Sequence, residues 1–217
     1  MNRRAFGVWF LLAFTVEMPA MAIEEVKYTV IGADGSFELR DYPSYRVVQT
    51  FVDGRFEDVG DEGFRRLFAY ISGANKTTSK IPMTAPVEQQ SSALVPSVKI
   101  PMTAPVEQQA VGDRWRIAFV LPASYTRDTA PQPTDERVQI AEVPPHRVVA
   151  VRYRGSWSRS RFEEHLAQLR GFLAGRGMTP VGEPIWDRYD PPFMPWFLRR
   201  NEIRIAVQDA PGAPPGR

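Results

Sequence analysis

The 217-residue chain contains no cysteine and only two histidines. Without cysteine it can form no disulfide, and it has neither a thiol nucleophile nor a thiolate site for a metal. Two histidines are too few for a metal centre built from several imidazoles. The formal net charge of +2 is too small for a protein that binds nucleic acid through a basic surface. The composition therefore predicts neither a metal site nor a nucleic-acid partner.

The motifs of common catalytic sites are also absent. The sequence has no G-x-S-x-G nucleophile elbow, no glycine-rich phosphate loop and no H-E-x-x-H zinc motif. These absences favour a binding protein over an enzyme, and we expect no catalytic residues. Beyond the N-terminus, no run is apolar enough to cross a membrane, so we expect no membrane span in the mature protein.

The N-terminus has the features of an export signal. Arg3 and Arg4 precede an apolar run from Ala5 to Val16, and Ala20–Ala22 supplies small residues for cleavage. The run is too short to cross a hydrocarbon core of about 30 Å as a helix, so we favour a cleaved signal peptide over an uncleaved anchor. Residues 1–22 are therefore expected to be a signal peptide, and the protein to be exported, either periplasmic or secreted.

Both halves of the chain show the same order of strands and helices. In each half, two alternating strands separated by a proline-containing turn precede one amphipathic helix. We expect each strand pair to form a hairpin, turned at Pro43-Ser44 and at Pro144-Pro145. The second helix should begin with a capping box of Ser160 and Glu163. The expected elements are strands 37–42, 45–52 and 115–122 with helix 57–72, and strands 137–143 and 146–153 with helix 161–174.

The two halves also match in register. Residues 45–48 correspond to 146–149 at an offset of 101 residues, and Leu67 corresponds to Leu169 at an offset of 102. We interpret this match as an internal repeat. The expected fold class is α+β: a distorted antiparallel β-barrel from two pseudo-twofold ββαββ-like repeats with two flanking helices. Residues 23–208 should form this single domain, and the Pro/Gly-rich residues 209–217 a disordered tail.

Eleven residues, KIPMTAPVEQQ, occur twice, at 80–90 and again at 99–109. In an extended segment Met83 and Met102 lie on the apolar face of their copies, with Lys80 and Lys99 at the ends. One interpretation is that the flexible methionine side chains line a binding site for a flat ligand, with the lysines near its carboxylates. The other is an edge hairpin whose methionines fill gaps in the core. Both interpretations remain open at the level of the sequence.

The duplicated KIPMTAPV, the segment FVLPASYT and the late segment YDPPFMPWFLRRNEI together resemble the SOUL haem-binding protein family. The resemblance covers residues 26–207, nearly the whole chain after the expected signal peptide. It implies a distorted barrel of two pseudo-repeats with two flanking helices. It also implies a hydrophobic cleft for haem or another tetrapyrrole, between the first helix and the Pro-rich C-terminal loop.

The resemblance also indicates which residues line this cleft. On the first helix, the aromatic face of Phe64 and Phe68 suits a porphyrin ring. In the loop, Met194 and Trp196 add apolar surface, Met194 at a position that can be basic in relatives. Asp41 stands where some relatives have a histidine proposed to bind the iron. Because a carboxylate is a poor ligand for haem iron, we expect weak or no axial ligation.

Two arginines end the same loop, and two roles are open to them. Arg199 and Arg200 can bind the carboxylates of a tetrapyrrole as bidentate donors. Alternatively, the loop packs across the barrel and one of the two arginines pairs internally with Glu202.

We therefore expect an exported, non-enzymatic protein that binds haem or a related hydrophobic tetrapyrrole in an apolar cleft. One alternative is a hydrolase-like enzyme that acts on a small hydrophobic electrophile in the same cleft. It would need a glutamate or aspartate, such as Glu142 or Asp187, to face inward beside a tyrosine. Another alternative is a module that binds a protein partner without any ligand. The sequence does not indicate the oligomeric state.

Overall fold

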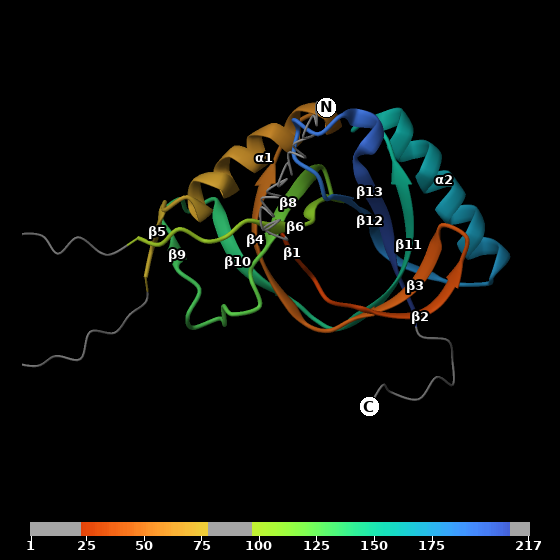
Figure 1. The fold of residues 1–217 in the computed structure, drawn as a ribbon, viewed down its shortest axis with the longest axis horizontal. Helices are drawn as coiled ribbons and strands as arrows, with labels where there is room; N and C mark the ends of the chain where they lie inside the picture. The colour runs from red at the N-terminus through yellow and green to blue at the C-terminus, as the bar shows by residue number, and fades with distance from the viewer. Residues whose placement is uncertain (1–22, 78–96, 209–217) are drawn as a thin grey trace, which may run out of the picture.

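A computed structural model describes residues 23–77 and 97–208 of the chain. In these residues a nine-stranded antiparallel sheet is covered by two helices, so the fold is α+β, as the sequence predicts (Figure 1). Four short strands form two further two-stranded sheets. The elements are β1 (Glu24–Glu25), β2 (Thr29–Asp34), β3 (Phe37–Tyr42), β4 (Tyr45–Val52), α1 (Phe56–Ile71), β5 (Asn75–Lys76), β6 (Thr103–Ala104), β7 (Val106–Val111), β8 (Arg114–Val120), β9 (Gln132–Pro133), β10 (Val138–Val143), β11 (His146–Arg154), α2 (Arg159–Gly175), β12 (Pro180–Arg188), a 3-10 helix (Trp196–Leu198) and β13 (Arg200–Val207).

The order of the nine strands shows that the sheet curls. It runs β10-β4-β8-β7-β12-β13-β11-β3-β2. β3 and β4 lie near opposite ends of this order, although only Pro43 and Ser44 join them. Pro144 and Pro145 join β10 to β11 in the same manner. Because a two-residue link reaches only about 11 Å between the strand ends, the two ends of the sheet must lie near each other.

The curled sheet is open. Among the described strands, no pairing joins β10 to the other end of the sheet. β2, a strand that the alternation pattern does not predict, pairs with β3 along the edge that β10 would have to join to close the sheet. The predicted β-barrel is therefore corrected to an open, curled sheet, with α1 and α2 on its outer face (Figure 1).

The predicted hairpins are wrong in both halves, and in the same way. β3 pairs with β11 and β2, while β4 pairs with β10 and β8. The turns at Pro43-Ser44 and Pro144-Pro145 therefore pass the chain from one half of the sheet to the other. Alternation of apolar and polar residues predicts a strand and its two faces, but it carries no information on the partner strand.

The two helices lie within two residues of their predicted ends. A Cβ atom on Gly63 would overlap the side chain of Ile117, so glycine at this position allows the close approach of α1 to β8. The predicted capping box of Ser160 and Glu163 is wrong. The N-cap is Ser158, whose hydroxyl accepts a backbone N–H, and α2 already includes Ser160.

The inner face of the curled sheet contains buried charges. Glu202 on β13 is fully buried, and its carboxylate accepts hydrogen bonds from three arginines: Arg40 at 2.5 Å, Arg152 at 2.8 Å and Arg200 at 2.9 Å. Burial alone would raise the pKa of Glu202, but these arginines outweigh it and hold the pKa at about 2. Such a group ties several strands together, and removing one buried partner typically costs about 3–5 kcal/mol.

A second buried group on the inner face joins the two halves of the sheet. Glu107 on β7 and Asp187 on β12 are cross-strand neighbours, and Arg204 pairs with both. Tyr45 donates a hydrogen bond to Glu107 at 3.0 Å, and Arg116 pairs with the same carboxylate at 2.9 Å. Burial raises the pKa of Asp187 to about 7, with Arg204 acting in the opposite sense. These groups belong to the scaffold, because each is engaged by the others.

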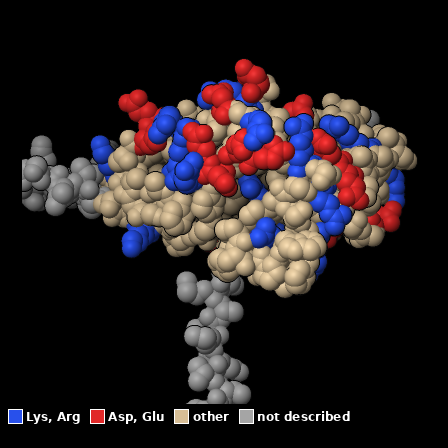
Figure 2. All heavy atoms as spheres, turned by 90° about the horizontal axis from the view of Figure 1, so that it is seen from above, with Lys and Arg blue, Asp and Glu red and all other residues tan. Residues whose placement is uncertain are grey.

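The side of the molecule that carries the two helices has mixed charge. Basic and acidic side chains lie next to each other there, beside a broad uncharged area (Figure 2). Within residues 23–77 and 97–208, no helix is long and apolar enough to cross a membrane. Three predicted features lie outside the described residues: the signal peptide (1–22), the first copy of the motif with Lys80 and Met83, and the tail (209–217).

Candidate functional site

An apolar cleft lies between α1, the second copy of the duplicated motif and the Pro-rich loop that follows β12. We call it the outer cleft. Its volume is about 340 Å³, which falls within the range of ligand pockets. Its lining residues are Ile23, Gly60, Asp61, Phe64, Met102, Thr103, Ala104, Val106, Trp157, Arg188, Tyr189, Asp190, Pro191, Pro192 and Phe193.

The outer cleft brings together part of the predicted site. Phe64 from α1 and Met102 from the second copy of the motif both line it. Phe68 stacks on Phe64 with ring centroids 5.8 Å apart, but it lies outside the lining and is exposed. Lys99 is exposed and lies outside the lining as well. The second copy of the motif therefore contributes residues to the lining of the cleft, but its lysine does not lie there as the first of the two interpretations expects.

Arg188 brings a cation into this apolar cleft. One Nη atom donates a hydrogen bond to Oε1 of Gln108 at 2.8 Å, and the guanidinium carbon lies 5.4 Å and 4.9 Å from the ring centroids of Trp157 and Trp186. Its Nε atom is buried without a hydrogen-bond partner, and no carboxylate of the described residues forms an ion pair with it. Burial lowers the pKa of Arg188 to about 10, against the smaller effect of Asp61. Arg188 therefore stays charged at neutral pH, at a cost that a bound anion would reduce.

The guanidinium of Arg188 packs closely against α1. A Cβ atom on Gly60 would lie 2.8 Å from Nη2 of Arg188, so glycine at this position of α1 makes space for the guanidinium. Nε1 of Trp157 is a second buried donor without a partner in the wall of the cleft. Buried donors are rarely left unpaired in proteins. Both unpaired donors belong to residues that line the outer cleft.

The Pro-rich loop directs several predicted site residues away from the cleft. Nε of Arg199 donates a hydrogen bond to the backbone carbonyl of Met194 at 2.8 Å, and the guanidinium lies over the ring of Trp157. Trp196 is exposed. None of Met194, Trp196 and Arg199 lines the outer cleft. Arg199 instead stabilises the loop through its hydrogen bond to the loop backbone and its contact with Trp157.

Arg200 and Asp41 lie outside the lining of the cleft and are engaged in ion pairs. Arg200 pairs with Glu202 on the inner face at 2.9 Å, which is the internal pairing that the sequence offered as an alternative. Asp41 accepts a hydrogen bond from Arg147 at 2.7 Å, and this bond holds the pKa of the carboxyl below its usual range.

The two histidines also lie outside the lining of the cleft. His146 opens β11 and stacks on Tyr42, and His165 on α2 stacks on Tyr153, with ring centroids 5.4 Å and 4.0 Å apart. In the part of the chain that the structure describes, no group of three or more potential ligands could hold a metal ion. The described lining therefore offers no histidine to an iron atom in the outer cleft.

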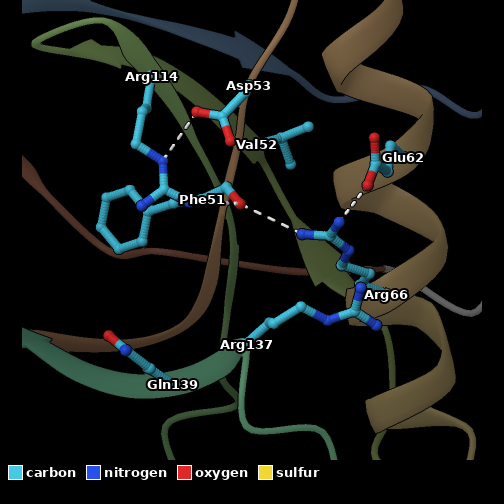
Figure 3. Close-up of a pocket in the computed structure, with 8 residues that line it drawn as sticks. All are labelled: Phe51, Val52, Asp53, Glu62, Arg66, Arg114, Arg137 and Gln139. Carbon is cyan, nitrogen blue, oxygen red and sulfur yellow. Dashed lines mark hydrogen bonds and ion pairs between the residues drawn. The ribbon is translucent and has the colours of Figure 1, made fainter.

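A second pocket lies between α1 and the strands β4 and β10. Its volume, about 370 Å³, is similar to that of the outer cleft, but its lining is polar. Three arginines line it, and each pairs with an acidic side chain. Figure 3 shows Arg66 with Glu62 and Arg114 with Asp53, and Arg137 pairs with Asp135. Because these charges are already compensated, we assign no ligand to this pocket.

A curled antiparallel sheet with two outer helices, and an apolar cleft beside one of them, defines the class of this α+β protein. The chain belongs to the SOUL heme-binding protein family, whose model matches residues 23–206. The family resemblance of the sequence is thereby confirmed over the described domain.

The chain is similar in sequence to two haem-binding relatives and in fold to two solved structures. It is 27% identical over 174 residues to Heme-binding protein 1 of Xenopus laevis, covering 77% of this chain and 82% of the relative. It is 29% identical over 143 residues to Heme-binding protein 1 of Mus musculus, covering 65% of this chain and 68% of the relative. The EcmrR C-terminal domain matches with a TM-score of 0.57 at 11% identity, over 84% of this chain and 99% of that chain. A hydrolase from Listeria innocua matches with a TM-score of 0.53 at 12% identity, over 82% of this chain and 94% of that chain. At such identities the two structures share a fold, which does not imply a shared function.

Proposed function

We propose that the outer cleft binds haem or a related tetrapyrrole, and that Arg188 pairs with a carboxylate of this ligand. The observation that carries the proposal is a cation without an ion-pair partner among the described residues, enclosed by an apolar cleft. Membership of the SOUL family and the similarity to two proteins named Heme-binding protein 1 support the choice of ligand.

The apolar walls of the cleft supply most of the binding free energy in this proposal. Phe64, Val106 and Phe193 remove part of a flat ring from water, at about 25 cal/mol per Å² before the costs of association. The cleft lies at the small end of ligand pockets, so part of the ring remains exposed. We propose that binding rests on the ring and its carboxylates, with weak or no axial ligation of iron. The described lining contains no histidine, and the hydroxyl of its Tyr189 donates a hydrogen bond to Glu202, which leaves the thioether of Met102 as the other side chain of an axial-ligand type.

We also propose that the protein is not an enzyme. The hydrolase alternative needs a glutamate or aspartate, such as Glu142 or Asp187, in the cleft beside a tyrosine. Asp187 instead lies buried on the inner face against Arg204, and Glu142 lies half-exposed on β10, 4.0 Å from Arg46. Neither residue lines the outer cleft, and the carboxylates that do line it, with Tyr189, are Asp61 and Asp190. Asp190 accepts the backbone N–H of Arg200, and Asp61 acts on the charge of Arg188. The similarity to a hydrolase shows the fold alone.

Replacing Phe64 with alanine should weaken the binding of haem and of iron-free protoporphyrin by a similar factor, about tenfold. The variant removes apolar wall area that both ligands cover. Absorbance titration of the haem Soret band and fluorescence titration of protoporphyrin give the two dissociation constants. The Phe68→Ala variant is the matched control, and its effect should be smaller because Phe68 lies outside the lining.

The His165→Ala variant separates apolar binding from iron ligation. The Soret band of a haem complex should stay nearly unchanged in this variant, because His165 lies on α2 against Tyr153. The contrary result has two parts: His165→Ala abolishes the Soret shift of bound haem, and Phe64→Ala binds haem as tightly as the wild type. Together they would mean that iron ligation dominates and that the outer cleft is not the site.

We propose further that the protein is exported after cleavage behind Ala22. The proposal rests on Arg3 and Arg4, the short apolar run and the small residues at 20–22. Mass spectrometry of the exported protein should find an N-terminus at Ile23. Intact Met1 in a membrane fraction would contradict the proposal and support an uncleaved anchor.

We infer, finally, that the two halves of the domain are an internal repeat. Exchanging the halves replaces β3 with β10, β4 with β11, β7 with β12 and β8 with β13. After this replacement, the order β10-β4-β8-β7-β12-β13-β11-β3 becomes β3-β11-β13-β12-β7-β8-β4-β10. This is the observed order read backwards. In an experimental structure, residues 37–73 should superpose on 137–175 with the same hand, and a different hand would refute the inference.

A further inference from the structure

The loop between β12 and β13 carries a group of exposed apolar side chains. Phe193 is 86% exposed, Trp196 58%, Phe197 57% and Leu198 45%. We call these four residues the aromatic tip. Single exposed apolar side chains are common on protein surfaces, but several large ones on one short loop indicate an interaction surface.

The loop itself holds the aromatic tip in its exposed position. Nε of Arg199 donates a hydrogen bond to the carbonyl of Met194 at 2.8 Å, and Nη1 of Arg154 donates one to the carbonyl of Leu198 at 2.9 Å. Pro195 precedes the 3-10 helix, and its ring fixes one backbone angle of the loop. Because the loop is braced on both sides, the aromatic side chains are presented to the outside and not folded inward.

We propose that the aromatic tip inserts into the surface of a lipid bilayer that contains anionic lipids. Tryptophan and phenylalanine favour the boundary between headgroups and acyl chains. Arg154 at the base of the tip is exposed and hydrogen-bonds the carbonyl of Leu198, so its guanidinium would lie near the headgroups. The carboxylates at the base of the loop are engaged elsewhere: Asp190 accepts the backbone N–H of Arg200, and Glu25 pairs with the Arg200 side chain.

The aromatic tip is continuous with the outer cleft. Phe193 belongs to the tip and also lines the cleft. Insertion of the tip would therefore bring the mouth of the cleft to the bilayer surface, where a hydrophobic tetrapyrrole partitions. That consequence rests on the proposed function, whereas the insertion itself requires no ligand.

The fluorescence of Trp196 tests the insertion directly. The difference between the emission spectra of the wild-type protein and the Trp196→Phe variant isolates this side chain, because the other tryptophans are common to both. With vesicles of phosphatidylcholine and phosphatidylglycerol, the emission should shift to shorter wavelength and be quenched by lipids with brominated acyl chains. Phosphatidylcholine alone, or high salt, should reduce the effect. No tetrapyrrole is added, so the result does not depend on the proposed ligand.

The Trp196→Ala/Phe197→Ala double variant should bind the mixed vesicles at least about tenfold more weakly in a sedimentation assay, because two apolar side chains no longer insert. The control Val111→Ala/Val181→Ala changes exposed apolar residues elsewhere and should bind like the wild type. A Trp196 emission that stays unchanged with vesicles overturns the proposal. A shift that depends on protein concentration without lipid also overturns it, and would assign the tip to contacts with a second copy of the chain.

Discussion

The Arg188→Met variant should bind haem and iron-free protoporphyrin about 10- to 100-fold more weakly than the wild type, with little change in stability. A hydrogen bond between a charged donor and a carboxylate contributes about 1.5–3 kcal/mol, which corresponds to this range. Methionine keeps much of the length of the side chain and its apolar contacts. The variant loses the hydrogen bond to Gln108, but it also removes the cost of enclosing a cation that forms no ion pair with any described residue. Binding titrations and denaturant unfolding measure the two effects separately.

A ligand without carboxylates completes this test. The wild type should bind the dimethyl ester of protoporphyrin about as weakly as Arg188→Met binds the free acid, and the variant should no longer distinguish acid from ester. If the variant weakens acid and ester equally, Arg188 acts through packing alone. The matched control is Arg204→Met, which removes a paired buried arginine from the inner face and should lose about 3–5 kcal/mol of stability. A similar loss in Arg188→Met would make Arg188 a structural residue.

The sequence predicts the strands of this fold better than their pairing. β3 and β4 begin and end at the predicted residues, because the two faces of the sheet differ and the alternation records that difference. The pairing of β4 with β10 joins residues far apart in the chain, and no local pattern specifies it. β2 was missed because its residues are mostly exposed and show no clear apolar face.

The candidate site shows the same limit. Phe64 and Met102 could be predicted from an apolar helix face and an apolar motif, and the fold brings both to one cleft. Arg188 was missed because an isolated arginine is typical of a solvated surface. Alternation along β12 does place it on the same face as the buried Trp186, which was the available signal. Its enclosure depends on Gly60 and Trp157 from other elements, which only the tertiary structure shows.

Replacing Glu202 with glutamine should lower the free energy of unfolding by about 3–5 kcal/mol at pH 7. The variant leaves the fully buried Arg40 without its charged partner on β13 and weakens the pairing of Arg152 and Arg200. Denaturant unfolding of wild type and variant measures the loss. The control is Glu25→Gln, which removes the more exposed partner of Arg200 and should cost less than about 1 kcal/mol.

The difference between wild type and Glu202→Gln should shrink as the pH falls. The pKa of Glu202 is about 2 in the folded protein and about 4.3 in an unfolded chain, so the folded state binds this proton less readily. The resulting stability is fully present above about pH 5 and is lost progressively as the pH falls through 4 toward 2, in total about 3 kcal/mol. Glutamine cannot titrate, so the variant lacks this part of the acid dependence. Unfolding measured at a series of pH values between 7 and 2 should therefore give converging curves. Parallel curves would mean that the three arginines do not hold Glu202 ionised, and that the inner face is stabilised by packing instead.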